Sequence, residues 1–210
     1  MSETSSYSFT IEVYTTALQV SGSYELPLYR RVSDALNSRL RRFIALHHAS
    51  VAPLGRPQQA QQVPQILVDW SDALLVATIN EPEPPPGFVA PAPLRDTQPI
   101  MFFTSAFALR ADFYKRSDME LVELLGEMTD DFIPLRNVTL FPLQGGQPLN
   151  RAFVCLNRHR IQALYVVGAP LVNVPVPASF DPAHLPFPVR QPVLASEPVE
   201  PPLETPGPTA

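Results

Sequence analysis

The chain has little cysteine and no long apolar run, and both shortages restrict its class. Its single cysteine, Cys155, cannot form a disulfide within the chain, which indicates a reducing compartment. The first residues lack the charged and apolar regions of a signal peptide. The longest apolar run, residues 163–172, is interrupted by glycine and proline and is far shorter than the roughly 20 residues of a membrane helix. We therefore expect a cytoplasmic protein without a membrane-inserted segment.

Positive charge is also scarce. The net charge of −5 argues against a nucleic-acid binder, because such proteins neutralise phosphates. Catalytic motifs are missing as well: the sequence has no Gly-x-Ser-x-Gly, no His-Glu-x-x-His and no Arg-x-x-x-Arg pair of the kind that cyclic-dinucleotide barrels use. Gly145-Gly146 matches no phosphate-binding fingerprint. The sequence predicts a protein that is not an enzyme and holds no cofactor.

Proline, in contrast, is abundant and unevenly placed. The chain has 26 prolines, where average usage would give roughly ten or eleven. They concentrate in Pro82–Pro99 and in Pro170–Pro208. The first stretch predicts an extended, semi-rigid spacer, and the second has too little apolar surface to fold alone. Its Val-Pro and Leu-Pro-Phe-Pro segments could lie in a partner's groove, cover an exposed strand edge, or act only as a spacer.

A repeat of the sequence organises the remaining residues. Tyr14–Leu18 resembles Phe103–Phe107, and Phe43–Leu46 resembles Phe132–Leu135, so that the two copies are offset as Phe43 is from Phe132. A repeat identifies the building block of the fold and provides an internal control. A side chain that a shared chemistry required in one copy would be expected in the other.

Each copy predicts the same secondary structure. Residues 18–26 and 107–113 alternate apolar and polar side chains, and this period of two predicts a half-buried strand in both copies. Apolar residues at helical spacing predict short helices over 32–40 and 121–128. Further strands are predicted at Phe43–Leu54 and Phe132–Leu143, and then at Gln65–Ile79 and Ala152–Val167, the last as a hairpin that turns near Asn157.

These elements predict a mainly β chain of two tandem modules, each a small β-barrel or curved sheet with one short helix. A disordered, proline-rich tail follows them. The predicted boundaries are a flexible N-terminus at 1–8, module 1 at 9–80, the linker at 81–98, module 2 at 99–169 and the tail at 170–210.

Residues Arg31–Asn37, followed by Phe43–Leu46, resemble the pattern of a bacterial family of small β-rich domains of unknown function. That pattern has a strand pair, an Arg-hydrophobic-Ser-Asp-x-Leu-Asn helix and a Phe-hydrophobic-Pro-Leu-x-Asn-Val strand. The second copy keeps the strand in Phe132–Val138 but departs from the pattern at its helix. The resemblance implies a fold and no activity.

Two polar groups stand out within the copies. Ser33, Asp34 and Asn37 could begin a ligand-contacting helix, but they also suit a helix cap and a C-terminal Asn, and the second copy loses all three. The adjacent His47 and His48 would point to opposite faces of a strand, so they cannot easily share a metal ion.

Their counterparts in the second copy, Arg136 and Asn137, favour a polar bulge or turn instead. His159 and His184 lack a metal ligand at a recognised spacing, so we expect no metal site. Cys155, which aligns roughly with Asp69, predicts an inert or half-exposed strand thiol.

The two predicted helices differ most in charge. Arginines surround the first helix, and carboxylates surround the second. Either both are solvated helix faces, or the basic face meets an acidic face within the chain or on another copy. The candidate interaction residues are Arg30, Arg31, Arg39, Arg41, Arg42, Glu120, Glu123, Glu127, Asp130 and Asp131. We expect an adaptor or structural protein that acts through a protein partner or through self-association. The alternative is a sensor that holds a small anion at the arginines of module 1.

Overall fold

In the computed structural model, the described residues are 6–38, 42–89, 96–114 and 119–168. The contacts group Met1–Ala169 into one compact unit. The predicted disordered tail at 170–210 lies outside the described residues, as do residues 90–95 of the predicted linker and residues 1–5 of the predicted flexible N-terminus. The module boundaries remain a prediction.

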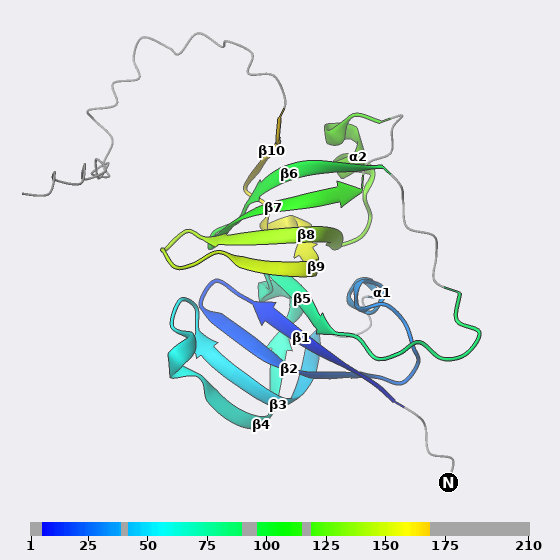
Figure 1. Cartoon of the computed structure of the whole chain (residues 1–210), viewed down its shortest axis with the longest axis vertical. Helices are drawn as coiled ribbons and strands as arrows, with labels where there is room; N and C mark the ends of the chain where they lie inside the picture. The colour runs from blue at the N-terminus through cyan, green and yellow to red at the C-terminus, as the bar shows by residue number, and fades with distance from the viewer. Residues whose placement is uncertain (1–5, 39–41, 90–95, 115–118, 169–210) are drawn as a thin grey trace, which may run out of the picture. The chain divides into compact units, whose positions relative to one another are not determined.

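The described chain is mainly β: ten strands form one antiparallel open sheet, accompanied by two short helices (Figure 1). In chain order the elements are β1 (Tyr7–Tyr14), β2 (Leu18–Leu26), α1 (Val32–Asn37), β3 (Phe43–Pro53), the 3-10 turn η1 (Pro57–Gln59), β4 (Gln61–Asp69), η2 (Trp70–Asp72), β5 (Leu75–Asn80), β6 (Thr97–Phe103), β7 (Phe107–Tyr114), α2 (Leu121–Glu127), β8 (Phe132–Pro142), β9 (Leu149–Asn157), η3 (Arg158–Arg160) and β10 (Ala163–Val166).

The element order repeats, as the sequence predicted. Residues 7–80 (the first half) and 97–166 (the second half) each run strand, strand, helix, strand, strand, 3-10 turn, strand, and the first half has a further 3-10 turn, η1, between β3 and β4. The predicted strands at Phe43–Leu54 and Phe132–Leu143 and the two short helices are confirmed to within a few residues.

The ten strands form one open sheet and not two closed barrels. The strand order is β10-β6-β7-β8-β9-β5-β1-β2-β3-β4, so that one sheet runs through both halves. The fourth strand of the second half, β9, pairs with the last strand of the first half, β5, rather than with its own last strand, β10. This pairing across the halves leaves the sheet open at β4 and β10, so that of the two predicted alternatives, a small β-barrel or a curved sheet, the closed barrel is wrong.

A threonine side chain stabilises the turn of the first hairpin in each half. The Thr15 side-chain oxygen accepts from the backbone N–H groups of Ala17 and Leu18 at 3.2 and 2.9 Å. The buried Thr104 oxygen accepts from Phe107 N–H at 3.1 Å in the same way. Side-chain oxygens of Ser and Thr often satisfy turn N–H groups, so the repeated Thr-Thr/Ser-Ala segment is the signal of this turn.

A β-bulge interrupts β3 and β8 at the predicted polar positions. His48 and Asn137 are the only non-glycine residues of the described chain with positive φ, at 48° and 49°. The pairing register shifts beside each of them. Asn tolerates this left-handed conformation, and the Asn137 amide also donates to an Asp112 carboxylate oxygen at 2.7 Å. The prediction of a bulge or turn is confirmed.

The predicted hairpin at Ala152–Val167 is wrong, and the predicted strand at Gln65–Ile79 is two strands that do not pair with each other. A 3-10 turn follows β4 and β9, and it carries the chain to the opposite edge of the half, where β5 pairs with β1 and β10 pairs with β6. Each turn begins with a side-chain cap: Asp69 accepts from Ser71 N–H at 2.9 Å, and Asn157 accepts from His159 N–H at 3.0 Å.

Two apolar cores lie on opposite faces of the central strands. On β5, Leu75 and Ala77 pack in the second-half core, whereas Val76 between them packs in the first-half core. On β9, Val154 and Leu156 pack in the second-half core and Cys155 in the first-half core. Because side chains alternate along a strand, the sheet supplies a core on each face as it passes from one half to the other.

Candidate functional site

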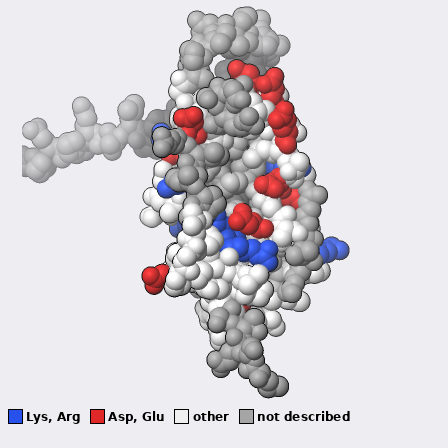
Figure 2. Space-filling model, turned by 90° about the vertical axis from the view of Figure 1, so that its right-hand side faces the viewer, with Lys and Arg blue, Asp and Glu red and all other residues white. Residues whose placement is uncertain are grey.

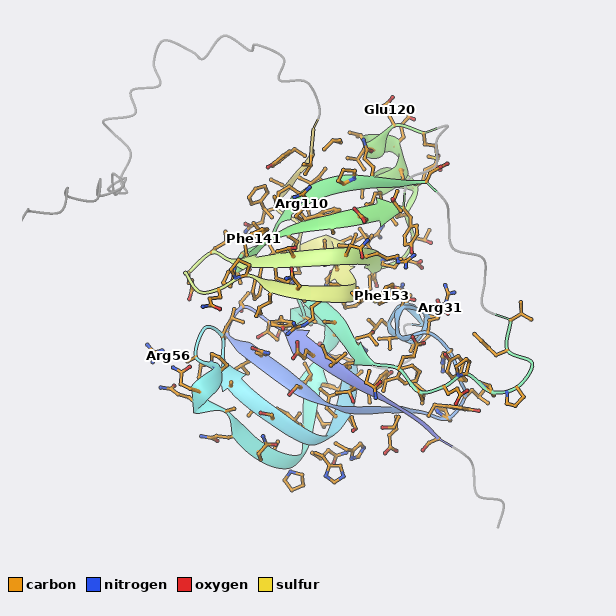
Figure 3. The ribbon with its side chains drawn as sticks, viewed as in Figure 1. Arg31, Arg56, Arg110, Glu120, Phe141 and Phe153 are labelled. Atoms are coloured by element: carbon orange, nitrogen blue, oxygen red, sulfur yellow. The ribbon has the colours of Figure 1, made fainter. Side chains whose placement is uncertain are left out.

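The junction of the halves is a ladder of four residue pairs between β5 and β9. Leu75 pairs with Leu156, Val76 with Cys155 and Ala77 with Val154, and all six side chains are fully buried. The fourth pair joins Thr78 and Phe153, and Phe153, labelled in Figure 3, packs against the first-half core. Each half therefore covers the outer face of the other half's edge strand.

A half-buried polar network secures one side of this junction. Arg151 on β9 donates from Nε and Nη2 to Glu12 Oε2 on β1, at 2.9 and 2.7 Å. Tyr14 donates its hydroxyl to the same oxygen at 2.6 Å and accepts from Arg151 Nη2 at 3.1 Å. Burial, and then the hydrogen bond to Glu12, raises the pKa of Tyr14 well above 10.0. A charge-assisted group of this kind fixes the orientation of the two halves.

Asn37 links α1 to the second half. Its amide donates to Phe132 O at 3.0 Å, and its carbonyl oxygen accepts from Phe132 N–H at 2.8 Å, so that the side chain pairs with the backbone as a neighbouring strand would. The prediction that Asn37 caps its own helix missed this contact. Ser33 and Asp34 do not cap α1 either, since the helix begins at Val32 without a side-chain cap. Ser33 instead donates to Asp34 at 3.4 Å.

The charged residues at the junction pair mainly within their own half. A cleft lined by Arg42, Asp131 and residues of η2 and η3 lies between α1 and β8. Arg42 Nε contacts Asp69 at 2.9 Å, whereas Asp131 contacts His159 at 2.9 Å and Arg158 at 3.9 Å. Solvent screens ion pairs at a protein surface, so these pairs contribute little to stability.

An ion pair between the halves lies beside this cleft. Arg160 of η3 contacts the Asp72 carboxylate at 3.2 Å and also donates to Ser71 O. Of the predicted interaction residues, Arg42 and Asp131 thus reach the same cleft, each with a partner in its own half. Among the described residues, Arg151 and Arg160 form ion pairs that join the halves, and the comparison of helix charges did not select either of them.

The remaining predicted interaction residues do not gather at one site. Arg31, beside α1, and Glu120, beside α2, lie far apart (Figure 3). Acidic side chains dominate the upper part of the face in Figure 2, and basic and acidic groups adjoin near its middle. Glu123 reaches back to Glu120 N–H at 3.4 Å, which gives Glu123 a role at the start of α2. Glu127 and Asp130 are exposed, and Arg39 and Arg41 lie outside the described residues.

Arg30 lines a cleft in the first half. This cleft of about 450 Å³ lies between β2, α1 and β3, and its lining includes Glu25, His47 and Trp70. The Arg30 Nε atom is buried and has no hydrogen-bond partner among the described residues. Because Glu25 lines the same cleft, the site combines both signs of charge.

Cys155 is fully buried, and burial raises the pKa of its thiol far above the usual range. The structure corrects its alignment: in the repeat Cys155 on β9 is equivalent to Leu67 on β4, and Asn157 is equivalent to Asp69. In the described parts of the chain, no three His, Cys, Asp or Glu side chains are grouped as metal ligands.

The two outer strands of the sheet carry exposed apolar side chains. Within the described sheet, β4 neighbours only β3, and β10 neighbours only β6. Leu67 on β4 is 63% exposed, and Tyr165 on β10 is 52% exposed. Uncovered strand edges with apolar side chains are sites at which a sheet can accept a further strand. They are the sites that the sequence alone did not identify, because strand order cannot be deduced from a local pattern.

Comparison with family models, with curated proteins and with solved structures gives no match for this chain. The resemblance of Arg31–Asn37 to a bacterial family therefore stays a prediction. None of the helices in the described segments combines the length and the apolar character needed to cross a membrane. The geometry of the junction, the clefts and the strand edges is thus the basis for assigning a role.

Proposed function

We propose that the chain is a non-catalytic adaptor or structural protein that acts through protein–protein contacts of two tandem β modules. The observation that carries this proposal is the pair of open strand edges, β4 and β10, with Leu67 and Tyr165 exposed beside them. A strand from a partner could extend the sheet at either edge, where backbone hydrogen bonds supply affinity and side-chain pockets supply specificity.

The proposal is tested by affinity capture from the native cell with the full chain as bait. A bait carrying both Leu67→Lys and Tyr165→Lys places a charge at each edge without touching a buried side chain. Val122→Lys is the matched control, because Val122 is 82% exposed and belongs to α2 and not to either edge strand. We expect captured proteins that are retained by the control bait and lost with the double variant. Identical capture by all three baits contradicts an edge-dependent role.

A second candidate is a sensor for a small anion, and the buried, unpartnered Arg30 Nε in the first-half cleft favours it. Glu25 in the same cleft weakens it, and Arg42 lines a different cleft. A thermal melt with inorganic pyrophosphate is its test. The sensor requires a rise in the melting temperature that Arg30→Gln removes and that added sodium chloride of equal ionic strength does not reproduce.

A further inference from the structure

The junction inside the chain shows which strand edges fit each other. β9 is the fourth strand of its half and β5 is the last strand of its half, and these two edges pair in antiparallel fashion. The edges left open, β4 and β10, are again a fourth strand and a last strand. The sheet therefore has two open edges, and they are of the same two kinds, a fourth strand and a last strand, that pair with each other at β9 and β5.

We propose that β10 of one copy pairs with β4 of a second copy and continues the sheet head to tail. This inference rests on the proposed function, because it names the partner that the open edges accept. The internal register, transferred through the repeat, pairs Ala163 with Val68, Leu164 with Leu67, Tyr165 with Ile66 and Val166 with Gln65. The ladder has four pairs, as at β5–β9.

The limits of both strands fit this ladder. β10 spans only Ala163–Val166, the four residues that the register uses. On β4 the next residue is Pro64, which has no backbone N–H to donate and which therefore ends the ladder where β10 ends.

Side chains that are exposed at the open edges are the counterparts of side chains that are buried at the junction. Leu75 and Ala77 of β5 are buried in the core of the other half, whereas their counterparts Ala163 and Tyr165 on β10 are exposed. Cys155 of β9 is buried in the first-half core, whereas its counterpart Leu67 is exposed. Pairing between copies would bury Tyr165 against the first-half core at Ile66, and Leu67 beside the second-half core at Leu164.

The polar network of the junction has apolar counterparts at the open edges. Arg151 on β9 corresponds to Val63 on β4, and Glu12 and Tyr14 on β1 correspond to Met101 and Phe103 on β6. At the junction an arginine meets a carboxylate and a phenol. At the proposed contact a valine meets a methionine and a phenylalanine. On both strands of the proposed contact, apolar side chains replace the polar ones of the junction, so the two surfaces remain complementary.

This contact joins two different surfaces of the same chain, so it is heterologous. Each added copy presents a new β4 or β10 edge, and such contacts form rings where the rotation closes and filaments where it does not. One blocked edge on every copy is enough to abolish assembly, because each contact needs one β4 and one β10. That property separates the proposal from a symmetric dimer, which would bury the same edge twice.

Purified full-length chains with single substitutions test the proposal by size-exclusion chromatography with light scattering. The wild type should give masses above the monomer that increase with concentration. Leu67→Lys alone and Tyr165→Lys alone should each be monomeric at concentrations where the wild type and Val122→Lys assemble. Circular dichroism should show that all variants fold, since all three positions are exposed.

Mixing the two edge variants provides the decisive measurement. Leu67→Lys retains β10 and Tyr165→Lys retains β4, so the mixture should contain a one-to-one heterodimer that does not grow further. A wild type that is monomeric at every concentration overturns the proposal, including the case in which the tail covers an edge. Edge variants that assemble as the wild type does, or a mixture that stays monomeric, also overturn it.

The outcome is distinguishable from failure of the adaptor function. If the purified chain does not self-associate but capture of other proteins depends on the edges, the adaptor proposal stands and self-pairing is wrong. If neither assembly nor capture depends on the edges, both are wrong.

Discussion

Replacing Asn37 by alanine tests whether the α1–β8 contact holds the two halves together. Asn37 makes two hydrogen bonds to the backbone of Phe132, whose side chain is 3% exposed and packs in the first-half core. A typical hydrogen bond contributes about 1 kcal/mol net, so Asn37→Ala should cost about 2 kcal/mol. For a chain of this size that loss lowers the melting temperature by about 4 to 8 °C.

Urea unfolding followed by tryptophan fluorescence measures this loss at the contact itself. Trp70 is the only tryptophan, and its ring lies 5.7 Å from that of Phe132 in an edge-to-face arrangement. The midpoint should fall while the slope with urea stays unchanged, because the surface exposed on unfolding is nearly the same.

Asn150→Ala is the matched control. Asn150 lies on β9 and accepts one exposed hydrogen bond from Thr139 at 2.9 Å, so its removal should change stability by no more than about 0.5 kcal/mol. If Asn37→Ala costs no more than this control, the contact does not stabilise the junction and the reasoning is refuted.

Four further outcomes are expected. Gly126→Ala on α2 should stabilise the chain by roughly 0.5–1 kcal/mol in the same urea assay, because an added methyl group meets nothing within 4 Å; a loss of stability would contradict this. Tyr14→Phe should flatten the alkaline decline in stability: the raised pKa of Tyr14 means that the unfolded chain loses its phenol proton first, so stability is complete below pH 10.0 and falls above it. The Cys155 thiol should react with Ellman's reagent only after urea unfolds the chain, and rapid reaction of the native protein would contradict its burial. Asn157→Ala should cost about 1–3 kcal/mol by removing its bonds to Ala73 O and from His159 N–H, whereas Asp69→Ala at the exposed equivalent turn should cost clearly less.

Sequence comparison predicted what the two copies share. The half-buried strands, the short helices and the bulge at His48 and Asn137 each left a local signal in both copies. The 3-10 turns left a weaker one, since their caps are Asp69 in one copy and Asn157 in the other, and Cys155 was aligned with Asp69 instead of Leu67. The hairpin at Ala152–Val167 was predicted because a local pattern does not show that β10 pairs with β6 and not with β9.

The candidate sites could not be predicted, because they depend on pairing over long separations. Asn37 meets Phe132 across 95 positions, and Glu12 meets Arg151 across 139. Each partner has an ordinary local context, so no motif marks either of them. The charges around the two helices were visible, but Arg42 and Asp131 found partners in their own halves. Which edges stay open follows from strand order, and strand order follows from the β5–β9 pairing.

The β5–β9 ladder also has a consequence for how the chain folds. In linear repeat proteins each unit contacts only its neighbours through a shared interface, and units can unfold one after another. Here Leu75 and Ala77 complete the second-half core, and Cys155 completes the first-half core. Neither core is finished until strands about eighty positions apart have met, and contacts so distant in sequence slow folding. The two halves should therefore melt in a single cooperative transition, with the meeting of β5 and β9 as the late step of folding.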